Sequence, residues 1–476
     1  MKKVRLVLIS LLMFFAVTGC SNEDKNLLDK DDPTTIQVWH YYNGAQQEEF
    51  NRLVDEFNKT VGKEKGIIVD GSGQGTISDL ERNVLDSING KAGAADIPNI
   101  FAAYGDTAYQ VDKLGYAVDL NKYFSKDELS KYVDGYLEEG HFSSKDTLKI
   151  FPVAKSVELF MLNKTDWEKF ANATGASTND LNTIEGVTKV AEQYYNWTDS
   201  LTAAPNDGKA FFGRDAFANY MLVGYRQLAT DIFSKKDNKI VLNFEADIAK
   251  KLWDNYYVPY ISGYFSSSGK FRSDDIKIGN ILACVSSSSS VTYFPKEVIL
   301  NDEESHSIEL ETFACPKFKD GKDYVVQQGA GMVVLKSEEK EQQAAVEFLK
   351  WFTSDKQNIA FSNASGYLPV TKSANDLDKI TDEVEVNESV KKTLNTSLKM
   401  ISDNNMYTSV PFEKGTDARN VLETTMSNLA KQDRETVITN LSNGMNLEQA
   451  ISQFNNDTYF NQWYTNTKSQ LESLIK

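Results

Sequence analysis

The sequence predicts an α/β protein made of two lobes. The chain has 476 residues, which exceeds one ordinary domain and indicates two domains or one large α/β unit. Hydrophobic residues make up 41% of the chain and aromatic residues 11%, which is enough apolar surface for sizeable cores. Short apolar segments alternate with stretches of helical periodicity, and this alternation favours mostly parallel sheets.

The first strand and helix follow residue 35. Ile36 and Val38 alternate with polar Gln37, which predicts a strand that ends at Trp39. Residues 100–103 form a second apolar run, which predicts a buried strand. Between the two strands, one helix face is predicted from the i, i+3, i+4, i+7 spacing of Phe50, Leu53, Val54 and Phe57.

The carboxyl-terminal part changes from strands to helices. The apolar run 332–335 predicts a strand, and the helical spacing behind it comprises Ala345, Phe348, Leu349 and Phe352. About the last hundred residues lack strand character and are expected to pack as helices against the sheets rather than form a third domain. Their helical spacing is set by Val390, Leu394, Leu398, Ile401, Val421, Leu422 and Met426.

The amino terminus is typical of an exported lipoprotein. Lys2, Lys3 and Arg5 precede an apolar stretch at 6–17, which is too short to span a membrane comfortably. Val17-Thr18-Gly19-Cys20 matches a bacterial lipobox, so residues 1–19 are predicted to be a signal peptide and Cys20 to be lipidated, for example with palmitate. The alternative is an ordinary signal peptide that contains a cysteine.

The segment after Cys20 is polar and charged, so residues 20–35 are expected to be a lipid-anchored tether. Loss of the three amino-terminal cations would leave 48 Lys and Arg against 68 Asp and Glu, a net charge of −20. This acidity argues against a nucleic-acid partner. The protein is therefore expected outside the cytoplasm, anchored to the cell membrane through Cys20.

Motifs of catalysis and metal binding are missing from the sequence, so no catalytic residue, metal or cofactor is expected. Gly71, Gly73 and Gly75 have the wrong spacing for a dinucleotide fingerprint, and a flexible loop is the better interpretation. Cys284 and Cys315 could form a disulfide or remain two separate buried thiols, since sequence does not give the distance between their Cα atoms.

Polar side chains follow two of the predicted strands. Ser286–Ser290 come directly after an apolar run that ends at Val285, and this serine run is either a linker or a ligand contact. His40 and Tyr41 follow the first strand in the same way, with aromatic packing against the next helix as the alternative.

Taken together, these residues resemble the extracellular solute-binding proteins of family 1, which deliver sugars and polyol phosphates to ABC importers. The resemblance covers most of the mature chain. Within the family, the Trp-His start, residues 366–369, Thr371-Lys372 and residues 411–415 look most like glycerol-3-phosphate-binding proteins. The matching segments, in family order, are Trp39-His40, 96–101, 114–120, 151–152, 163–164, 278–283, 344–354 and 365–370.

The resemblance implies a two-lobed periplasmic-binding-protein-like fold of type II, with discontinuous lobes and a hinge. Lobe 1 is predicted to comprise residues 36–153 and 326–370. Lobe 2 is predicted to comprise residues 154–325 and 371–476, with crossovers near Pro152, Val325 and Pro369. Closure of such a cleft around a ligand would be the signal that the importer reads.

The family pattern also implies ligand contacts, at Ser156, Ser287, Ser288, Gly329 or Gly331, and Tyr367. The chain departs from the glycerophosphate binders in having no Tyr in the 73–80 region. Asp106 matches their acidic contact only with a shift of register, and Arg419 lies beyond the position of their basic residue.

Elementary chemistry adds further candidates. Gln74, Asp106 and Glu158 could accept hydrogen bonds from sugar hydroxyls, and the rings of Tyr41 and Tyr367 could cover the apolar faces of a sugar. A phosphate would instead need cations, for which Lys155, Arg214 and Arg419 are available, each with a solvated surface charge as the alternative. The acidic net charge favours a neutral saccharide.

The sequence therefore predicts a monomeric substrate-binding lipoprotein that captures a carbohydrate and delivers it to the permease subunits of an ABC importer. The alternative ligand is glycerol 3-phosphate or a glycerophosphodiester. An exported carbohydrate-active hydrolase is a competing class that would need two facing carboxylates, and a surface adhesin would have no cleft that closes.

Overall fold

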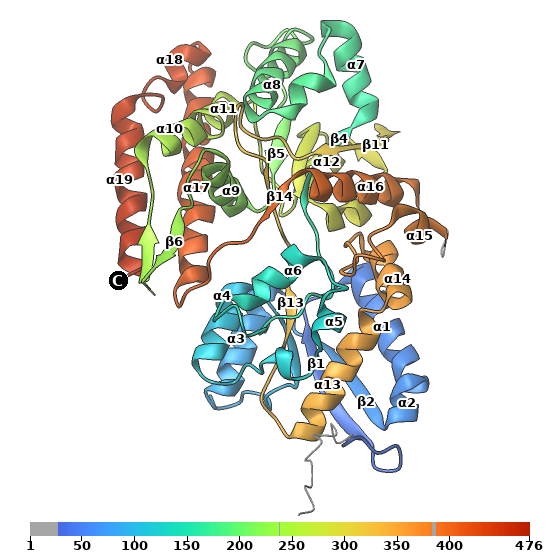
Figure 1. Cartoon of the computed structure of the whole chain (residues 1–476). Coiled ribbons are helices and arrows are strands. Elements are labelled where there is room, and N and C mark those ends of the chain that lie inside the picture. The colour runs from blue at the N-terminus through green and yellow to red at the C-terminus, as the bar shows by residue number, and fades with distance from the viewer. Residues whose placement is uncertain (1–26, 238, 383–386) are drawn as a thin grey trace, which may run out of the picture.

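The computed structural model describes residues 27–237, 239–382 and 387–476. Two lobes, each built around a four-stranded sheet, lie one above the other in Figure 1. The predicted signal peptide and the lipidation site Cys20 lie outside the described residues. Within the described part, none of the helices has the length and apolar character needed to cross a membrane.

Lobe 1 holds the sheet with strand order β13-β3-β1-β2. Helices α1 and α13 contact each other over the sheet through Phe50, Phe57 and Phe348. The two predicted strands and the amphipathic helix between them are confirmed. The strands are β1 Thr34–His40, β2 Ile67–Gly73, β3 Ile100–Ala103 and β13 Gly331–Val334; the helices are α1 Gly44–Lys59, α2 Val61–Lys65, α3 Ile77–Ile88, α4 Gly105–Lys113, α5 Lys126–Leu129, α6 Asp134–Glu138, α13 Glu339–Phe352 and α14 Asp355–Ser365.

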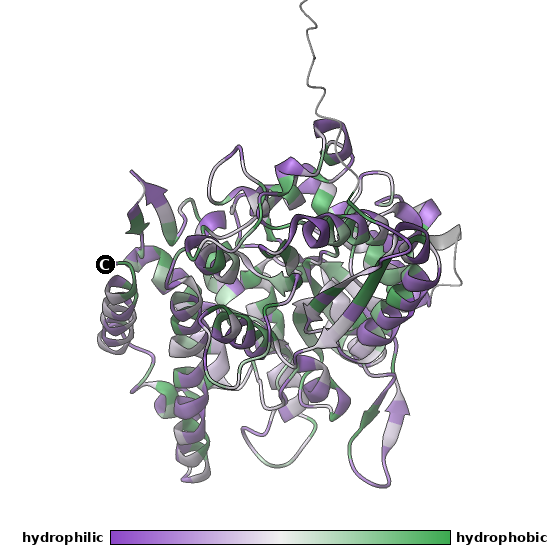
Figure 2. Cartoon of the chain, turned by 90° about the horizontal axis from the view of Figure 1, so that it is seen from below, coloured by the Kyte–Doolittle hydropathy of each residue, from purple (hydrophilic) through white to green (hydrophobic). Residues whose placement is uncertain are grey.

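Lobe 2 holds the sheet with strand order β11-β4-β8-β5 and most of the remaining helices. Its strands are β4 Glu158–Asn163, β5 Phe212–Arg214, β8 Ala283–Ser287 and β11 Leu310–Ala314, with the hairpins β6 Phe233–Lys236/β7 Lys239–Leu242 and β9 Glu297–Ile299/β10 Ser305–Ser307. The helices are α7 Lys164–Thr174, α8 Ile184–Asp199, α9 Phe217–Gln227, α10 Ala246–Asp254, α11 Tyr257–Ser262 and α12 Arg272–Lys277. In Figure 2 some of the interior strands are hydrophobic, whereas the outlying hairpins and many outer helix turns are hydrophilic.

The expectation of mostly parallel sheets holds for lobe 1 and is wrong for lobe 2. In lobe 1, β1 pairs in parallel with both β2 and β3, and only the edge strand β13 is antiparallel. In lobe 2, β4 lies inside the sheet and is antiparallel to both β8 and β11. Strands β4 and β13 both directly follow a crossing segment, so each enters its sheet from the hinge end and runs against its neighbours.

The lobes are joined by crossing segments that pair with one another. Ser156 and Gln328 exchange two backbone hydrogen bonds of 3.0 and 2.8 Å, and Lys155 N donates to Leu368 O at 3.1 Å. Strand β12 Tyr324–Val326 pairs in parallel with β14 Asn405–Tyr407, which runs between the lobes in Figure 1. The exact lobe boundaries stay a prediction.

The carboxyl-terminal residues are mainly helical, as predicted, except for the short strand β14 at Asn405–Tyr407, where no strand was predicted. Helix α17 packs against α9, α11 and α19, so this part completes lobe 2. The helices are α15 Leu377–Asp382, α16 Glu388–Asp403, α17 Gly415–Ser442, α18 Leu447–Ile451 and α19 Asp457–Leu474.

The pairing of the strands tests two local predictions, one on the glycine-rich segment 71–75 and one on the two cysteines. The flexible-loop interpretation of Gly71–Gly75 is wrong for its first half, because Gly71 and Gly73 pair with β1 as the end of β2. Cys284 and Cys315 are free thiols. Cys284 lies on β8 and Cys315 follows β11, and β4 lies between these strands. Strands two positions apart are separated by about 9.5 Å, beyond the reach of a disulfide.

Candidate functional site

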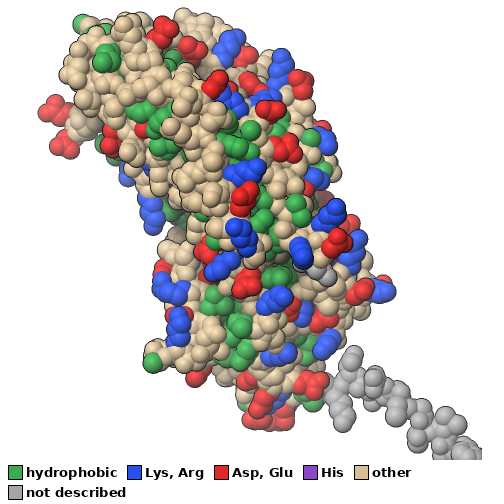
Figure 3. Space-filling model, turned by 90° about the vertical axis from the view of Figure 1, so that its left-hand side faces the viewer, with side chains coloured by type: hydrophobic (Ala, Val, Ile, Leu, Met, Phe, Trp, Pro, Cys, Tyr) green, Lys and Arg blue, Asp and Glu red, His purple; other side chains and the backbone are tan. Residues whose placement is uncertain are grey.

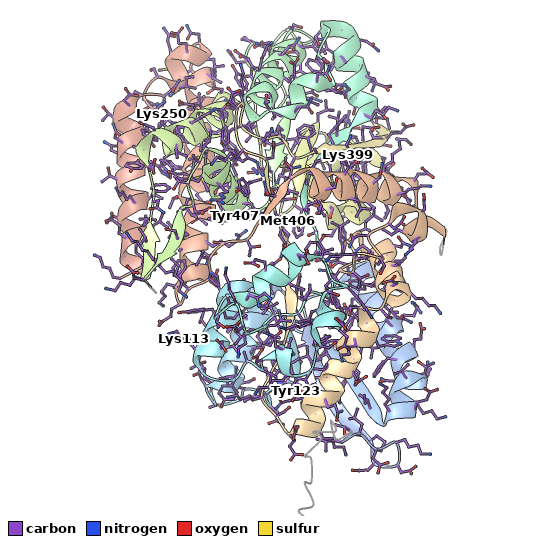
Figure 4. All side chains as sticks on the ribbon, viewed as in Figure 1. Lys113, Tyr123, Lys250, Lys399, Met406 and Tyr407 are labelled. Atoms are coloured by element: carbon purple, nitrogen blue, oxygen red, sulfur yellow. The ribbon has the colours of Figure 1, made fainter. Side chains whose placement is uncertain are left out.

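A cavity of about 310 Å³ lies between the two lobes. The space-filling view shows a notch between the upper and lower parts of the molecule (Figure 3), and Met406 and Tyr407 lie at this level in Figure 4. The cavity therefore has walls from both lobes and a floor of crossing segments. It is lined by Ile77, Ser78, Glu81, Tyr104, Gly105, Asp106 and Glu139 of lobe 1, by Ala216, Asn219, Leu222, Thr416, Arg419 and Asn420 of lobe 2, and by Val326, Gln327, Gln328, Tyr407, Thr408, Ser409 and Pro411.

The lobe 1 wall is built where β3 ends and α4 begins. Tyr104 is the N-cap residue of α4, is 37% exposed and lines the cavity. Asp106 is in the first turn of α4, and Glu81 projects from α3. Burial raises the pKa of Asp106 to about 6, and burial also raises the pKa of Glu81. This wall carries two carboxylates that lack a salt bridge within the described residues.

The lobe 2 wall is held by a buried polar network. Arg419 Nη2 donates to Asn219 Oδ1 at 2.5 Å, and Asn219 Nδ2 donates to Glu158 Oε1 at 2.8 Å. The other oxygen of Glu158 accepts from Arg214 Nη2 at 2.8 Å. The network thus fixes the Arg419 guanidinium at the cavity wall and leaves Glu158 and Arg214 behind it.

The start of α9 is strained at the cavity edge. Ala216, the N-cap residue, has φ of 47°, a left-handed conformation that is unusual for a residue other than glycine. The carboxylate of Glu423 on α17 accepts hydrogen bonds from the backbone N–H groups of Phe217 and Ala218, at 3.0 and 2.6 Å. This carboxylate caps α9 and thereby places Asn219.

The cavity floor includes two glutamines of a crossing segment, Gln327 and Gln328. The side-chain Oε1 atoms of Gln327 and Gln328 are buried and have no hydrogen-bond partner among the described residues. Beneath them, the Lys155 ammonium forms a buried salt bridge with Glu139 and donates to Gly329 O at 2.9 Å. Lys155 is fully buried, so its charge is paired with Glu139 inside the hinge and is not a solvated surface charge.

A second interlobe contact is filled with side chains. Tyr41 Oη and Tyr367 Oη lie 3.4 Å apart, and Tyr41 Oη accepts from Ala330 N at 3.3 Å. Ser287 Oγ donates to Ser156 Oγ at 3.0 Å, and Ser288 Oγ donates to Gly366 O at 3.3 Å. Among these bonds, the one from Ser288 joins the serine run of lobe 2 to lobe 1, at the Gly366 carbonyl next to Tyr367.

The predicted site residues fall into four groups. Asp106 and Arg419 line the cavity. Tyr41, Tyr367, Ser156, Ser287 and Ser288 form the filled contact, and Glu158 lies behind Arg419 in the polar network. Their roles as ligand contacts stay predictions.

The others lie in packed surroundings. His40 is fully buried against Phe50 and Tyr42, and burial lowers its pKa to about 4, so its ring is neutral. Gln74 is bonded to Ser72 and Asn83. Gly329 lies in the crossing segment, where a β-carbon would meet the backbone of Ala154 and Lys155, and Gly331 begins β13, where a β-carbon would meet Ile150 and the backbone of Phe151.

Several cavity residues were not found from the sequence. Tyr104 carries a usable signal, because it directly follows an apolar strand at the edge where α/β folds place ligand contacts. Glu81 and Asn219 lie within helices, and Gln327 and Gln328 lie in a crossing segment. Only the packing of distant segments brings these side chains to the cavity.

Solved structures with the same fold cover nearly all of this chain. The cyclic alpha-maltosyl-1,6-maltose binding protein from Arthrobacter globiformis has a TM-score of 0.66 at 18% identity, covering 93% of this chain and 99% of its own. UgpB from Mycobacterium tuberculosis in complex with glycerophosphocholine has a TM-score of 0.68 at 14% identity, covering 93% and 100%. An ABC substrate-binding protein from Listeria monocytogenes in complex with cycloalternan has a TM-score of 0.65 at 15% identity, covering 93% and 100%.

These likenesses establish the two-lobed periplasmic-binding-protein-like fold. No curated protein matches the sequence of this chain. Residues 52–388, more than half of the chain, match the family described as bacterial extracellular solute-binding protein. The resemblance inferred from the sequence is therefore confirmed, and the chain belongs to the bacterial extracellular solute-binding protein family.

Proposed function

We propose that this protein is the substrate-binding component of an ABC importer and that it captures a carbohydrate in the cavity between its lobes. Membership of a solute-binding family supports a carrier rather than an exported hydrolase. Two structures with the same fold are described as binding proteins for, or complexes with, the saccharides cyclic alpha-maltosyl-1,6-maltose and cycloalternan. The permease subunits of the importer would receive the ligand from a monomeric receptor.

The composition of the cavity wall carries this proposal. The Glu81 carboxylate and the second oxygen of Asp106 can accept further hydrogen bonds at this wall, and Gln327, Gln328 and Ser409 add polar side chains to the lining. Sugar hydroxyls supply many donors, and the exposed ring of Tyr104 can cover an apolar sugar face. A polyhydroxylated neutral molecule therefore satisfies more of this wall than an anion would.

A glycerophosphodiester is the second candidate ligand. The structure of UgpB bound to glycerophosphocholine has the same fold, and Arg419 offers a guanidinium at the cavity wall. The other two cations that sequence analysis considered are already paired, Lys155 with Glu139 and Arg214 with Glu158. One cation beside two unpaired carboxylates favours the neutral ligand.

The same proposal includes attachment to the outer face of the cell membrane. The lipobox at Val17–Cys20 supports cleavage before Cys20 and acylation of its thiol. Mass spectrometry of the membrane-extracted protein should show an acylated amino-terminal Cys20, and Cys20→Ala should release the protein from membranes.

The test of the function is a thermal unfolding screen of residues 21–476 with neutral mono- and oligosaccharides, sugar phosphates and glycerophosphodiesters. A ligand at 100 times its dissociation constant should add about 2.7 kcal/mol to the stability, which raises the melting temperature by a few degrees. We expect the hit to be a neutral saccharide. A hit restricted to phosphate compounds would support the second candidate, and no hit from a broad panel would contradict both.

Tyr104→Ala is expected to weaken carbohydrate binding at least about tenfold, because Tyr104 lines the cavity and its ring offers an apolar face. The melting temperature should change little, since the ring is partly exposed. Phe271→Ala is the matched control, because Phe271 is 53% exposed and does not line the cavity. Titration calorimetry with the saccharide from the screen measures both variants. Equal affinities for the two variants would remove Tyr104 from the site.

A further inference from the structure

The amino-terminal end of helix α17 opens onto the cavity. Thr416 and Arg419, in its first turns, line the cavity wall. The helix runs for 28 residues from Gly415 to Ser442, and its N-cap residue Lys414 gives no side-chain hydrogen bond to the helix end. Free backbone N–H groups and the helix dipole attract negative charge at such an end, and the Arg419 guanidinium adds to that attraction. Taken without its surroundings, this corner of the cavity suits an anion.

The corner is already occupied by a carboxylate from the opposite lobe. Asp106 Oδ1 accepts a hydrogen bond from Phe412 N at 3.1 Å, three residues before the helix begins. A β-carbon built on Gly415 would overlap the Asp106 carboxylate, so this group lies directly on the first residue of α17. Phe412 belongs to the lobe 2 core through its contact with Phe233, whereas Asp106 belongs to α4 of lobe 1.

We propose that Asp106 is a specificity-determining residue that excludes anionic ligands from the cleft by occupying the positive end of α17 with the protein's own negative charge. The proposal rests on the proposed function in placing the ligand in this cavity. A phosphate entering the cavity would have to displace the Asp106 carboxylate or lie beside it. A saccharide meets no such repulsion and can donate a hydroxyl to the second oxygen of Asp106.

The charged groups that face Asp106 come from two packed elements. Arg419 on α17 favours the ionised carboxyl group, and Glu81 on α3 disfavours it. Burial is the largest influence and raises the pKa of Asp106 to about 6. Asp106 is therefore ionised at pH 7.5 and largely protonated at pH 5.0. The exclusion of anions should weaken as the pH falls through this range.

The experiment measures the binding of one phosphodiester, sn-glycero-3-phosphoglycerol, by titration calorimetry in low-salt buffer at pH 7.5. This probe keeps one negative charge at both pH values used below. We expect Asp106→Asn to bind it at least about tenfold more tightly than the wild-type protein, because one repulsive charge is removed from the helix end. Glu81→Gln also removes one negative charge from the lobe 1 wall, but this charge does not lie on the end of α17. Its gain in affinity for the phosphodiester should therefore be clearly smaller.

The pH dependence of binding gives a second measurement. The affinity of the wild-type protein for the phosphodiester should rise between pH 7.5 and pH 5.0, and Glu81→Gln should keep this rise. Asp106→Asn should lose it. No gain in Asp106→Asn, or an equal gain in Glu81→Gln, would overturn the proposal. A wild-type protein that binds no carbohydrate contradicts the proposed function instead, and the two failures are measured with different ligands.

Discussion

Replacing Lys155 with Met should lower the free energy of unfolding by about 3–5 kcal/mol, because the substitution leaves a buried carboxylate without its cation. Lys155 is fully buried in the crossing segment, and Glu139 is 9% exposed. The ammonium bonds to Glu139 and to the carbonyl of Gly329, so it joins lobe 1 to two crossing segments. The remaining partner of Glu139, Gln327 Nε2 at 3.4 Å, is too weak to compensate for the lost charge.

Urea unfolding of three variants measures this effect. Lys164→Met is the matched control, because its pair with Glu309 spans 3.3 Å and is exposed, and its loss should cost less than about 1 kcal/mol. In the double variant Lys155→Met/Glu139→Gln the unpaired charge is gone, so much of the stability should return. A Lys155→Met protein within 1 kcal/mol of the wild type would show that the pair is not important for stability.

Local sequence patterns predicted the elements of this fold better than their arrangement. The run at 100–103 and the face formed by Phe50, Leu53 and Phe57 specify a strand and a helix through nearby residues alone. The direction of β4 in its sheet depends on where the chain crosses the hinge, which no local pattern records. Strand β14 has three residues and forms by pairing with β12, so it too has no local signal.

In the candidate site, too, single residues could be predicted from the sequence, whereas their partners in space could not. Asp106 was proposed from the family pattern, with a shift of register, and from the hydrogen-bonding chemistry of its carboxylate, and it lines the cavity. Arg419 was considered as a phosphate ligand, but the carboxylates beside it could be located only in three dimensions. For Lys155 and Arg214, named as candidate phosphate ligands, the alternative of a solvated surface charge was wrong. Lysine and arginine are usually exposed, and the sequence does not reveal their buried partners Glu139 and Glu158.

The family resemblance assigned Gly329 to ligand binding, but its backbone conformation and close packing give a structural reason for a glycine at this position. Its φ of 87° lies in the left-handed region, which an alanine adopts only with strain. A β-carbon at this position would lie 2.6 Å from Ala154 O and 3.1 Å from the Cα of Lys155. Two crossing segments can therefore approach each other at this point only if one of them carries a glycine.

Gly329→Ala should accordingly lower the free energy of unfolding by about 2–5 kcal/mol, about 1–2 from backbone strain and the rest from overpacking. Gly175→Ala measures the backbone strain alone, because Gly175 has φ of 76° and nothing lies within 4 Å of its β-carbon position. Urea unfolding of the two variants gives the steric cost as their difference. Because the carbonyl of Gly329 also accepts from Lys155, a shift of this segment should disturb the buried salt bridge as well. Equal losses in the two variants would show that the crossing segments can separate without cost, and the hinge would then be looser than its packing indicates.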